Sequence, residues 1–209
     1  TINIMKVSKK NGFNLFLLMP PAYYKYKDEG AHAYYSKIID KVPDCKIILY
    51  NFEKLCGYAF SVDIVERLVK DFPNQIVGVK DSTYNLYEKI KINNFSIFPG
   101  SETKLLRGLE IGCSGLISAT CNVTAPLARS VYNDFINKKP QTFNHKLCAV
   151  RKVFDKYNLI SALHSFKSNK NSIYNRLLPP LMLLNKEDQG QLLSELKSLD
   201  FIPDGKMVA

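Results

Sequence analysis

The sequence lacks several features that would assign it to a common class of protein. Its 209 residues contain no tryptophan and only three histidines, His32, His145 and His164, which lie far apart. The histidine positions give no support for a Ser-His-Asp arrangement, and no GxGxxG or Walker-type loop implies a nucleotide cofactor. Five cysteines occur without CxxC spacing or neighbouring histidines, which predicts reduced thiols and no metal site.

Long apolar runs are also absent. The longest, from Phe13 to Pro21, is interrupted by Asn14 and is shorter than the roughly 20 residues that cross a bilayer. The chain begins at Thr1, without a start methionine or a basic-then-apolar signal pattern. We therefore expect a soluble, cytoplasmic protein with no membrane contact.

The charge is the strongest compositional bias, with 29 basic and 19 acidic residues and a net charge of +10. Tyrosine and lysine alternate from Tyr23 to Lys27, so a non-enzymatic module that binds nucleic acid is one interpretation. The lysines, however, recur through nearly every predicted helix and turn instead of lining one face. We expect no nucleic-acid partner, and the same positive field suits an anionic small molecule.

Short apolar strands alternate with segments of helical period over the first two thirds of the chain. The predicted strands are 13–19, 46–50, 76–79, 95–98 and 115–119, each nearly continuously apolar, as in parallel strands covered on both faces. The predicted helices between them are 31–42, 61–72 with Ser61 as N-cap, 85–92 and 103–111. From about residue 124 only helical patterns follow: 124–137, 141–157, a looser stretch past His164, 172–184 broken by two prolines, and 186–199. The pattern predicts an α/β fold with about five βα units in residues 1–137 and a helical region in residues 138–209.

Candidate reactive residues follow from this arrangement, because reactive groups of parallel α/β folds lie at the carboxyl ends of the strands. Lys80 follows the third strand, where an apolar surrounding favours the neutral, nucleophilic amine. Tyr50 ends the preceding strand, so both side chains should project toward one opening, where a phenol can relay protons. A solvated lysine and a hydrogen-bonded core tyrosine are the structural alternatives.

The segments around these two residues resemble a known family. ILYNF, LCG, PNQIVGVKDS, FPGSE and GCSGLISATCNVTAP, in this order and together with MPPAYY, resemble the dihydrodipicolinate synthase and N-acetylneuraminate lyase family of pyruvate-dependent class I aldolases. The resemblance implies a (β/α)8 TIM barrel with a C-terminal helical region, usually in a homotetramer. It also implies that Lys80 forms an imine with a 2-keto acid, that Tyr50 shuttles protons and that no separate cofactor is needed. Tyr24, or Tyr23 beside it, matches a loop tyrosine near the subunit contact.

The substrate class depends on positions that differ within this family. Dihydrodipicolinate synthases carry a carboxylate-binding arginine where this chain has Leu55, which weighs against that activity but leaves it as an alternative. Glu102 matches the place where sugar-acid lyases present an acid to substrate hydroxyls, although a glutamate at a helix start is equally well explained by the helix dipole. Ser82 and Ala119 are further expected substrate contacts. We expect a lyase or aldolase for pyruvate or a 2-keto-3-deoxy sugar acid.

Part of the expected barrel is missing from the sequence. A complete barrel needs eight βα units and typically about 250 residues, and the carboxylate-binding Gly-Thr-Thr-Gly type motif of the family does not occur here. We expect the chain to be a fragment that lacks the first three strands; a genuine relative that has lost part of the barrel is the alternative. Unpaired parallel edges would then favour self-association of the isolated chain.

Overall fold

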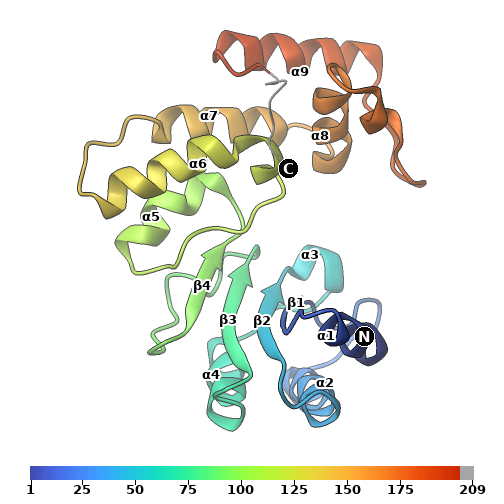
Figure 1. Cartoon of the computed structure of the whole chain (residues 1–209), viewed down its shortest axis with the longest axis vertical. Coiled ribbons are helices and arrows are strands. Elements are labelled where there is room, and N and C mark those ends of the chain that lie inside the picture. Colours follow the sequence, from blue (N-terminus) through green and yellow to red (C-terminus); the bar gives the residue numbers. More distant parts are fainter. Residues whose placement is uncertain (203–209) are drawn as a thin grey trace. The chain divides into compact units, whose positions relative to one another are not determined.

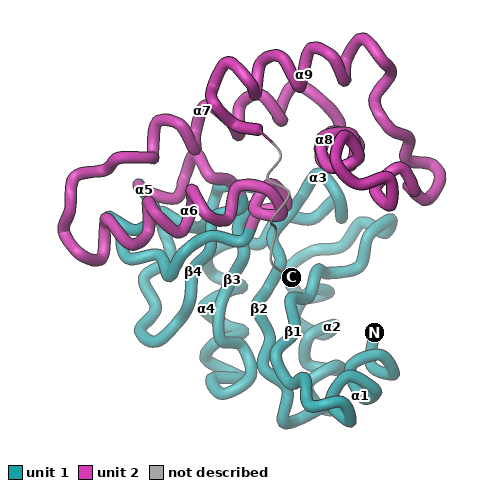
Figure 2. The backbone as a smooth tube through the Cα atoms, turned by 45° about the horizontal axis from the view of Figure 1, so that its top comes forward, with its two compact units in different colours: residues 1–100, 107–117 teal, residues 101–106, 118–209 magenta. Residues whose placement is uncertain are grey.

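Two compact units make up the chain. The computed structural model describes residues 1–202. Unit 1 contains residues 1–100 and 107–117, and unit 2 contains residues 101–106 and those from 118 onward (Figure 2). The boundary expected from sequence at residue 137 stays a prediction, and residues 203–209 of the expected helical region lie outside the described residues.

A parallel four-stranded sheet forms the centre of unit 1, in the order β1-β2-β3-β4 (Figure 1). Its strands are β1 (Leu15–Leu18), β2 (Lys46–Asn51), β3 (Ile76–Asp81) and β4 (Ser96–Pro99). The helices of this part of the chain are α1 (Ile2–Lys10), α2 (Asp28–Lys41), α3 (Glu53–Cys56), α4 (Val62–Asp71) and α5 (Leu105–Glu110), the last of which runs from unit 2 into unit 1.

The inner strands β2 and β3 are more deeply buried than the edge strand β1. Five of the six residues of β3 are buried, and Ile47 and Leu49 of β2 are fully enclosed, as expected for strands covered on both faces. In β1, by contrast, Leu15 and Leu17 are 53% and 43% exposed. One edge of the sheet therefore carries an apolar surface.

Helix α4 illustrates how the sequence determines the local structure. The Ser61 hydroxyl accepts a hydrogen bond from the Ile64 amide at 3.2 Å, which satisfies a donor at the start of the helix. Ile64, Val65 and Leu68 recur at helical spacing and are all buried in the core of unit 1. The predicted helix and its N-cap are confirmed.

Two elements predicted in unit 1 are wrong. Residues 115–119 do not form a strand: the amides of Ser114 and Ile117 donate to Ile97 and Pro99 of β4, but Gly115, at φ 149°, interrupts the extended path between them. The sheet therefore has four strands where we predicted five.

Residues 85–92 do not form a helix either. The Asp81 carboxylate accepts the amides of Leu86 and Tyr87, and a single turn follows, in which Lys89 and Ile90 donate to Leu86. The helical spacing of Leu86 and Ile90 instead reflects two buried side chains of a loop.

Unit 2 is helical. It contains η1 (Glu102–Lys104), α6 (Cys121–Ile136), α7 (Asn144–Phe154), α8 (Leu159–Ser168), η2 (Ser172–Asn175) and α9 (Lys186–Ser198). Helices α6 and α7 lie side by side (Figures 1 and 2), and Phe154, Phe166, Leu192 and Leu196 form the centre of its core. The helix predicted over 172–184 is limited to the single 3-10 turn η2, and the others are found with shifts of a few residues.

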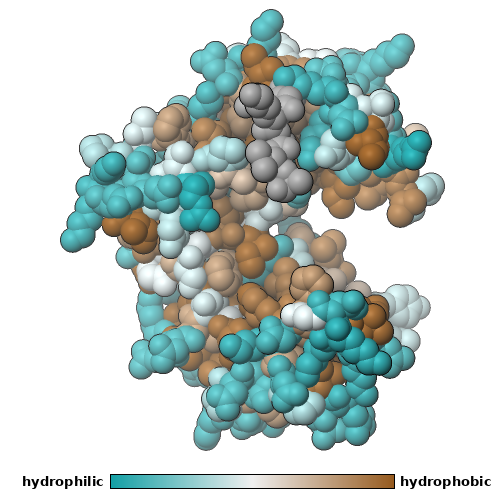
Figure 3. All heavy atoms as spheres, in the orientation of Figure 1, coloured by the Kyte–Doolittle hydropathy of each residue, from teal (hydrophilic) through white to brown (hydrophobic). Residues whose placement is uncertain are grey.

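The surface carries polar residues on both units. In the space-filling view, hydrophilic residues are spread over the visible face of each unit and do not gather on one of them (Figure 3). Within residues 1–202, no helix combines the length and apolar character required to span a bilayer.

Candidate active site

Lys80 and Tyr50 are brought together by the pairing of β2 with β3. Their Cα atoms are register partners in the parallel ladder, so both side chains leave the same face of the sheet. The Lys80 amine lies 3.9 Å from the centroid of the Tyr50 ring. The structure thus unites the two residues that we selected at neighbouring strand ends.

The environment of the Lys80 amine is unusual for a nearly buried cation. Lys80 is only 9% exposed, yet within residues 1–202 it has no carboxylate within 4 Å and no hydrogen bond. The Tyr50 hydroxyl likewise has no hydrogen-bond partner in the described residues. Because buried charges are normally paired, an amine held only against an aromatic face is a candidate for a functional group.

Asp81 fixes the loop that follows Lys80. As successive strand residues point to opposite faces, its carboxylate lies on the side away from Lys80 and is fully buried. One of its oxygens accepts the Asn51 side-chain amide at 2.8 Å together with the backbone amides of Thr83 and Tyr84, and the other accepts two more backbone amides. Asp81 therefore holds the end of β3 in place, as a turn-capping role predicts.

Asn51 continues this network behind the strand ends. Its side-chain amide also donates to Asn85 at 2.7 Å, and its oxygen accepts the backbone amide of Phe60 at 3.1 Å. Asn51 directly follows Tyr50, so a fully hydrogen-bonded residue immobilises the backbone next to the phenol. No role for Asn51 was predicted from the sequence.

Ser82 lies against Gly100, the residue that follows β4. A Cβ atom at Gly100 would come within 2.2 Å of the Ser82 hydroxyl oxygen, so only glycine fits this close approach. The Ser82 amide donates to the Asn51 carbonyl at 2.8 Å. These two contacts hold Ser82, the second residue after Lys80, in a defined position. That Ser82 contacts the substrate stays a prediction.

Glu102 lies in unit 2 at the centre of a polar cluster. Its carboxylate is fully buried; one oxygen accepts bonds from the Ser118 hydroxyl and Arg151 guanidinium at 2.8 and 2.9 Å, and the other accepts the Thr124 hydroxyl at 2.8 Å. The Arg151 guanidinium bonds Asp155 as well, and these two acidic partners raise its pKa against the opposing effect of burial. With both oxygens occupied by protein donors, the geometry supports a structural role for Glu102 and lends none to a direct substrate contact.

Ala119 and Tyr24 were the two other expected substrate contacts. Ala119 belongs to unit 2, where its carbonyl accepts the side-chain amide of Asn122 at 2.9 Å and where it lines a pocket. Tyr24 is 70% exposed in the loop between β1 and α2, with its ring edge-on to the ring of Tyr23. Their assignments as substrate-binding residues stay predictions.

Comparison with known proteins agrees with this geometry. The model of the dihydrodipicolinate synthetase family matches residues 1–199. The chain belongs to the dihydrodipicolinate synthetase family. A 2-dehydro-3-deoxy-D-gluconate/2-dehydro-3-deoxy-phosphogluconate aldolase from Picrophilus torridus is 26% identical over 186 residues, which cover 85% of this chain and 68% of the relative. A 4-hydroxy-tetrahydrodipicolinate synthase from Hydrogenobaculum sp. is 37% identical over 121 residues, or 56% and 41% of the two chains.

Solved structures of the dihydrodipicolinate synthetase family establish the fold. The dihydrodipicolinate synthase of Aquifex aeolicus superposes with a TM-score of 0.85 at 22% identity, over 98% of this chain and 72% of that one. The predicted partial TIM barrel is therefore confirmed, with four strands in the sheet. The chain spans about two thirds of the Picrophilus relative and less than half of the Hydrogenobaculum one. The prediction of a lyase of this family is also confirmed.

The Cys121 thiol lies beside Glu102, 3.6 Å from one of its carboxylate oxygens, but it is not suited to act as a second nucleophile. Burial and the nearby carboxylate raise the pKa of the Cys121 thiol to about 12, so this thiol is protonated at neutral pH. Within residues 1–202, no cluster of three or more histidine, cysteine, aspartate or glutamate side chains is placed to hold a metal ion.

Proposed function

We propose that this family member is a class I aldolase or lyase that forms an imine between Lys80 and the ketone of pyruvate or a 2-keto-3-deoxy sugar acid. The observation that supports this proposal is the nearly buried Lys80 amine, which rests on the Tyr50 ring at 3.9 Å without an acidic partner in the described residues. No carboxylate of the described residues lies within 4 Å of this amine to compete with a ketone for it.

The reaction follows from this amine. The Lys80 nitrogen attacks the keto carbon and gives up a proton as the carbinolamine forms; the hydroxyl of this intermediate then gains a proton and leaves as water, which gives the protonated imine. The substrate hydroxyl beside the scissile bond loses its proton, the electron pair of the carbon–carbon bond moves into the cationic imine, and the far fragment departs as an aldehyde. The enamine takes up a proton on carbon, and hydrolysis releases pyruvate and returns the free amine. The Tyr50 phenol relays these protons, since its hydroxyl has no other partner in the described residues.

A substrate with a polyol tail is favoured over one with a second carboxylate. Leu55 stands in α3 at the place where dihydrodipicolinate synthases carry an arginine; its side chain is exposed and offers no positive charge. The 37% identity to a 4-hydroxy-tetrahydrodipicolinate synthase keeps that activity as the second candidate. Release of pyruvate from 2-keto-3-deoxy acids, against consumption of aspartate semialdehyde with pyruvate, separates the two.

Three finer features of the proposal come from family resemblance. We infer a homotetramer, a cytoplasmic location and catalysis without a metal or organic cofactor, because the imine at Lys80 supplies the electron sink.

Borohydride trapping tests the chemistry directly. The full chain is treated with pyruvate and sodium borohydride, and its intact mass and peptide map are measured. A reduced pyruvate adduct on Lys80 supports the proposal. A folded protein that carries no adduct, or carries it equally on exposed lysines such as Lys89, refutes it.

Replacement of Tyr50 by phenylalanine tests the proton relay. The phenyl ring keeps the contact with the Lys80 amine but removes the hydroxyl, so we expect turnover to fall by roughly 10²–10⁴-fold. Adduct formation with borohydride should persist at long times, because the amine is retained. Replacement of Tyr84 by phenylalanine, in the loop after Lys80, serves as the matched control. Unchanged turnover in the Tyr50 variant would remove Tyr50 from the mechanism.

A further inference from the structure

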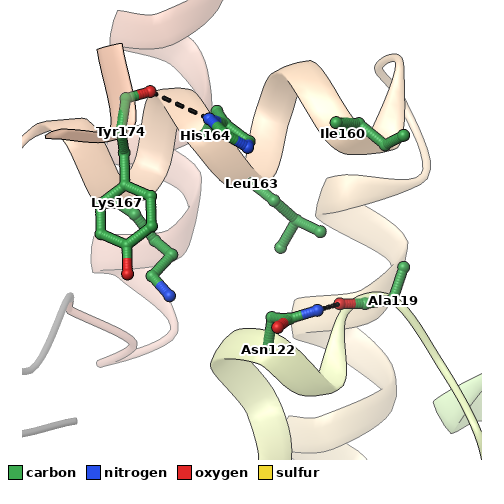
Figure 4. Close-up of a pocket in the computed structure, with 7 residues that line it drawn as sticks. All are labelled: Ala119, Asn122, Ile160, Leu163, His164, Lys167 and Tyr174. Atoms are coloured by element: carbon green, nitrogen blue, oxygen red, sulfur yellow. Dashed lines mark hydrogen bonds between the residues drawn. The ribbon is translucent and has the colours of Figure 1, made fainter. Parts of the chain in front are cut away.

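Unit 2 contains a pocket of about 200 Å³ that the proposed reaction does not explain. It lies between α8, the 3-10 turn η2 and the start of α6, and Figure 4 shows its side chains surrounding one space. The lining residues are Ala119, Asn122, Ile160, Leu163, His164, Lys167 and Tyr174.

The polar groups of this pocket are held in defined orientations. His164 Nδ1 lies 3.0 Å from the Tyr174 carbonyl oxygen, and because a carbonyl only accepts, Nδ1 carries the hydrogen and Nε2 is left for another partner. The Asn122 side-chain amide nitrogen donates to the Ala119 carbonyl at 2.9 Å, which fixes the orientation of that side chain. His164 and Asn122 are therefore oriented by the chain itself before any ligand binds.

Lys167 supplies the positive charge. Its amine lies 4.3 Å from the centroid of the Tyr174 ring, which stands edge-on to the His164 ring with centroids 6.0 Å apart. Within residues 1–202, no carboxylate lies within 4 Å of this amine, and none of the lining residues is acidic. The pocket thus places a lysine and a histidine together with no negative charge to neutralise them.

The apolar part of the lining limits what the pocket accepts. Ile160 and Leu163 on α8 present aliphatic side chains, which suit a short carbon chain and not a second charged group. The volume of about 200 Å³ fits one small anionic group with a few attached carbons.

We propose that this pocket binds the phosphate group of a small phosphomonoester, with Lys167 and His164 as its cationic and hydrogen-bonding partners. The dianion bonds the Lys167 amine and accepts a hydrogen bond from His164 Nε2 in the imidazolium form, in which both ring nitrogens carry hydrogens, while the carbon chain packs on Leu163. Two sources share this chemistry, the phosphate end of a substrate and a separate phosphorylated effector. The inference does not rest on the chemistry of Lys80.

Calorimetric titration of the full chain with glycerol 3-phosphate tests the proposal, with glycerol as the uncharged comparison. We expect saturable binding of the phosphomonoester alone. In Lys167→Met and in His164→Gln the affinity should fall about tenfold or more, whereas Lys170→Met, which removes an exposed lysine outside the pocket, should leave it unchanged. Melting curves of all variants verify that they fold.

Two results would overturn the site. One is the absence of binding to the wild-type chain, and the other is an equal loss of affinity in Lys170→Met. Because binding is measured without turnover, the same titration on Lys80→Met keeps this test separate from the imine chemistry. Competition between glycerol 3-phosphate and the keto acid identifies a substrate phosphate, and binding without competition identifies an effector; either result supports the site.

Discussion

Replacement of Arg151 by methionine is expected to lower the free energy of unfolding by about 3–5 kcal/mol. The guanidinium lies 2.9 Å from an oxygen of the fully buried Glu102 carboxylate, and it also donates to the hydroxyls of Ser118 and Thr120 at 3.0 and 3.1 Å. Methionine fills a similar volume but leaves that carboxylate buried without its charge partner. Urea denaturation followed by circular dichroism measures the loss.

Two further variants separate the ion pair from a general effect of losing an arginine. Arg129→Met removes an exposed arginine from α6 whose guanidinium lies 5.2 Å from the centroid of the Tyr132 ring, and it should lower the unfolding free energy by no more than about 1 kcal/mol. The double variant Glu102→Gln with Arg151→Met removes both charges and should recover part of the stability lost in the single variant. If Arg151→Met is as stable as Arg129→Met, the Glu102–Arg151 ion pair contributes little to the free energy of unfolding.

Replacement of Lys80 by methionine is expected to abolish activity while the protein remains folded. Without an amine no imine forms, so the pyruvate adduct should disappear and turnover should fall by more than about 10³-fold. The unfolding free energy should be unchanged or higher, because the substitution removes an unpaired, nearly buried cation and leaves an apolar chain on the Tyr50 ring. Steady-state kinetics and denaturation on the same preparation measure both effects.

Lys89→Met is the control for this experiment, since Lys89 is exposed in the loop that follows Lys80. It should retain both the adduct and the activity. An active Lys80→Met protein would contradict the proposed mechanism, and a strongly destabilised one would indicate that Lys80 has a structural role that its contacts do not reveal.

The sequence alone located the candidate pair because strand order and side-chain alternation are local properties. Lys80 and Tyr50 each lie one residue before the end of a strand, after a run of apolar residues, and parallel neighbours present the same face at the same register. The resemblance to a known family then suggested imine formation by Lys80 and proton transfer by Tyr50, which the positions of the two residues alone do not imply.

The environment of Glu102 could not be predicted from the sequence, because its hydrogen-bond partners lie far along the chain. Arg151 lies 49 positions after Glu102, in a helix where several basic residues are equally plausible partners. The pocket around Lys167 is a similar case, since His164 on its own resembled a helix-packing residue. Nothing local predicts that Tyr174 and Asn122 lie beside it.

The loop after Lys80 shows a different kind of ambiguity. Leu86 and Ile90 are four residues apart and both buried, which satisfies a helix and a compact loop equally well. The structure has a loop tied to the Asp81 carboxylate through the amides of Leu86 and Tyr87, followed by a single turn. Periodicity counts buried side chains and contains no information on where the backbone donors are used.

The path of the chain between its two units limits how recombination between genes can exchange parts of this protein. The chain passes from one unit to the other at residues 100, 106 and 117, and α5 itself begins in unit 2 and ends in unit 1. A recombination event with one breakpoint in the gene therefore cannot transfer either unit whole. A breakpoint near residue 117 would move Arg151 with the residues that follow and leave behind Glu102, its buried charge partner.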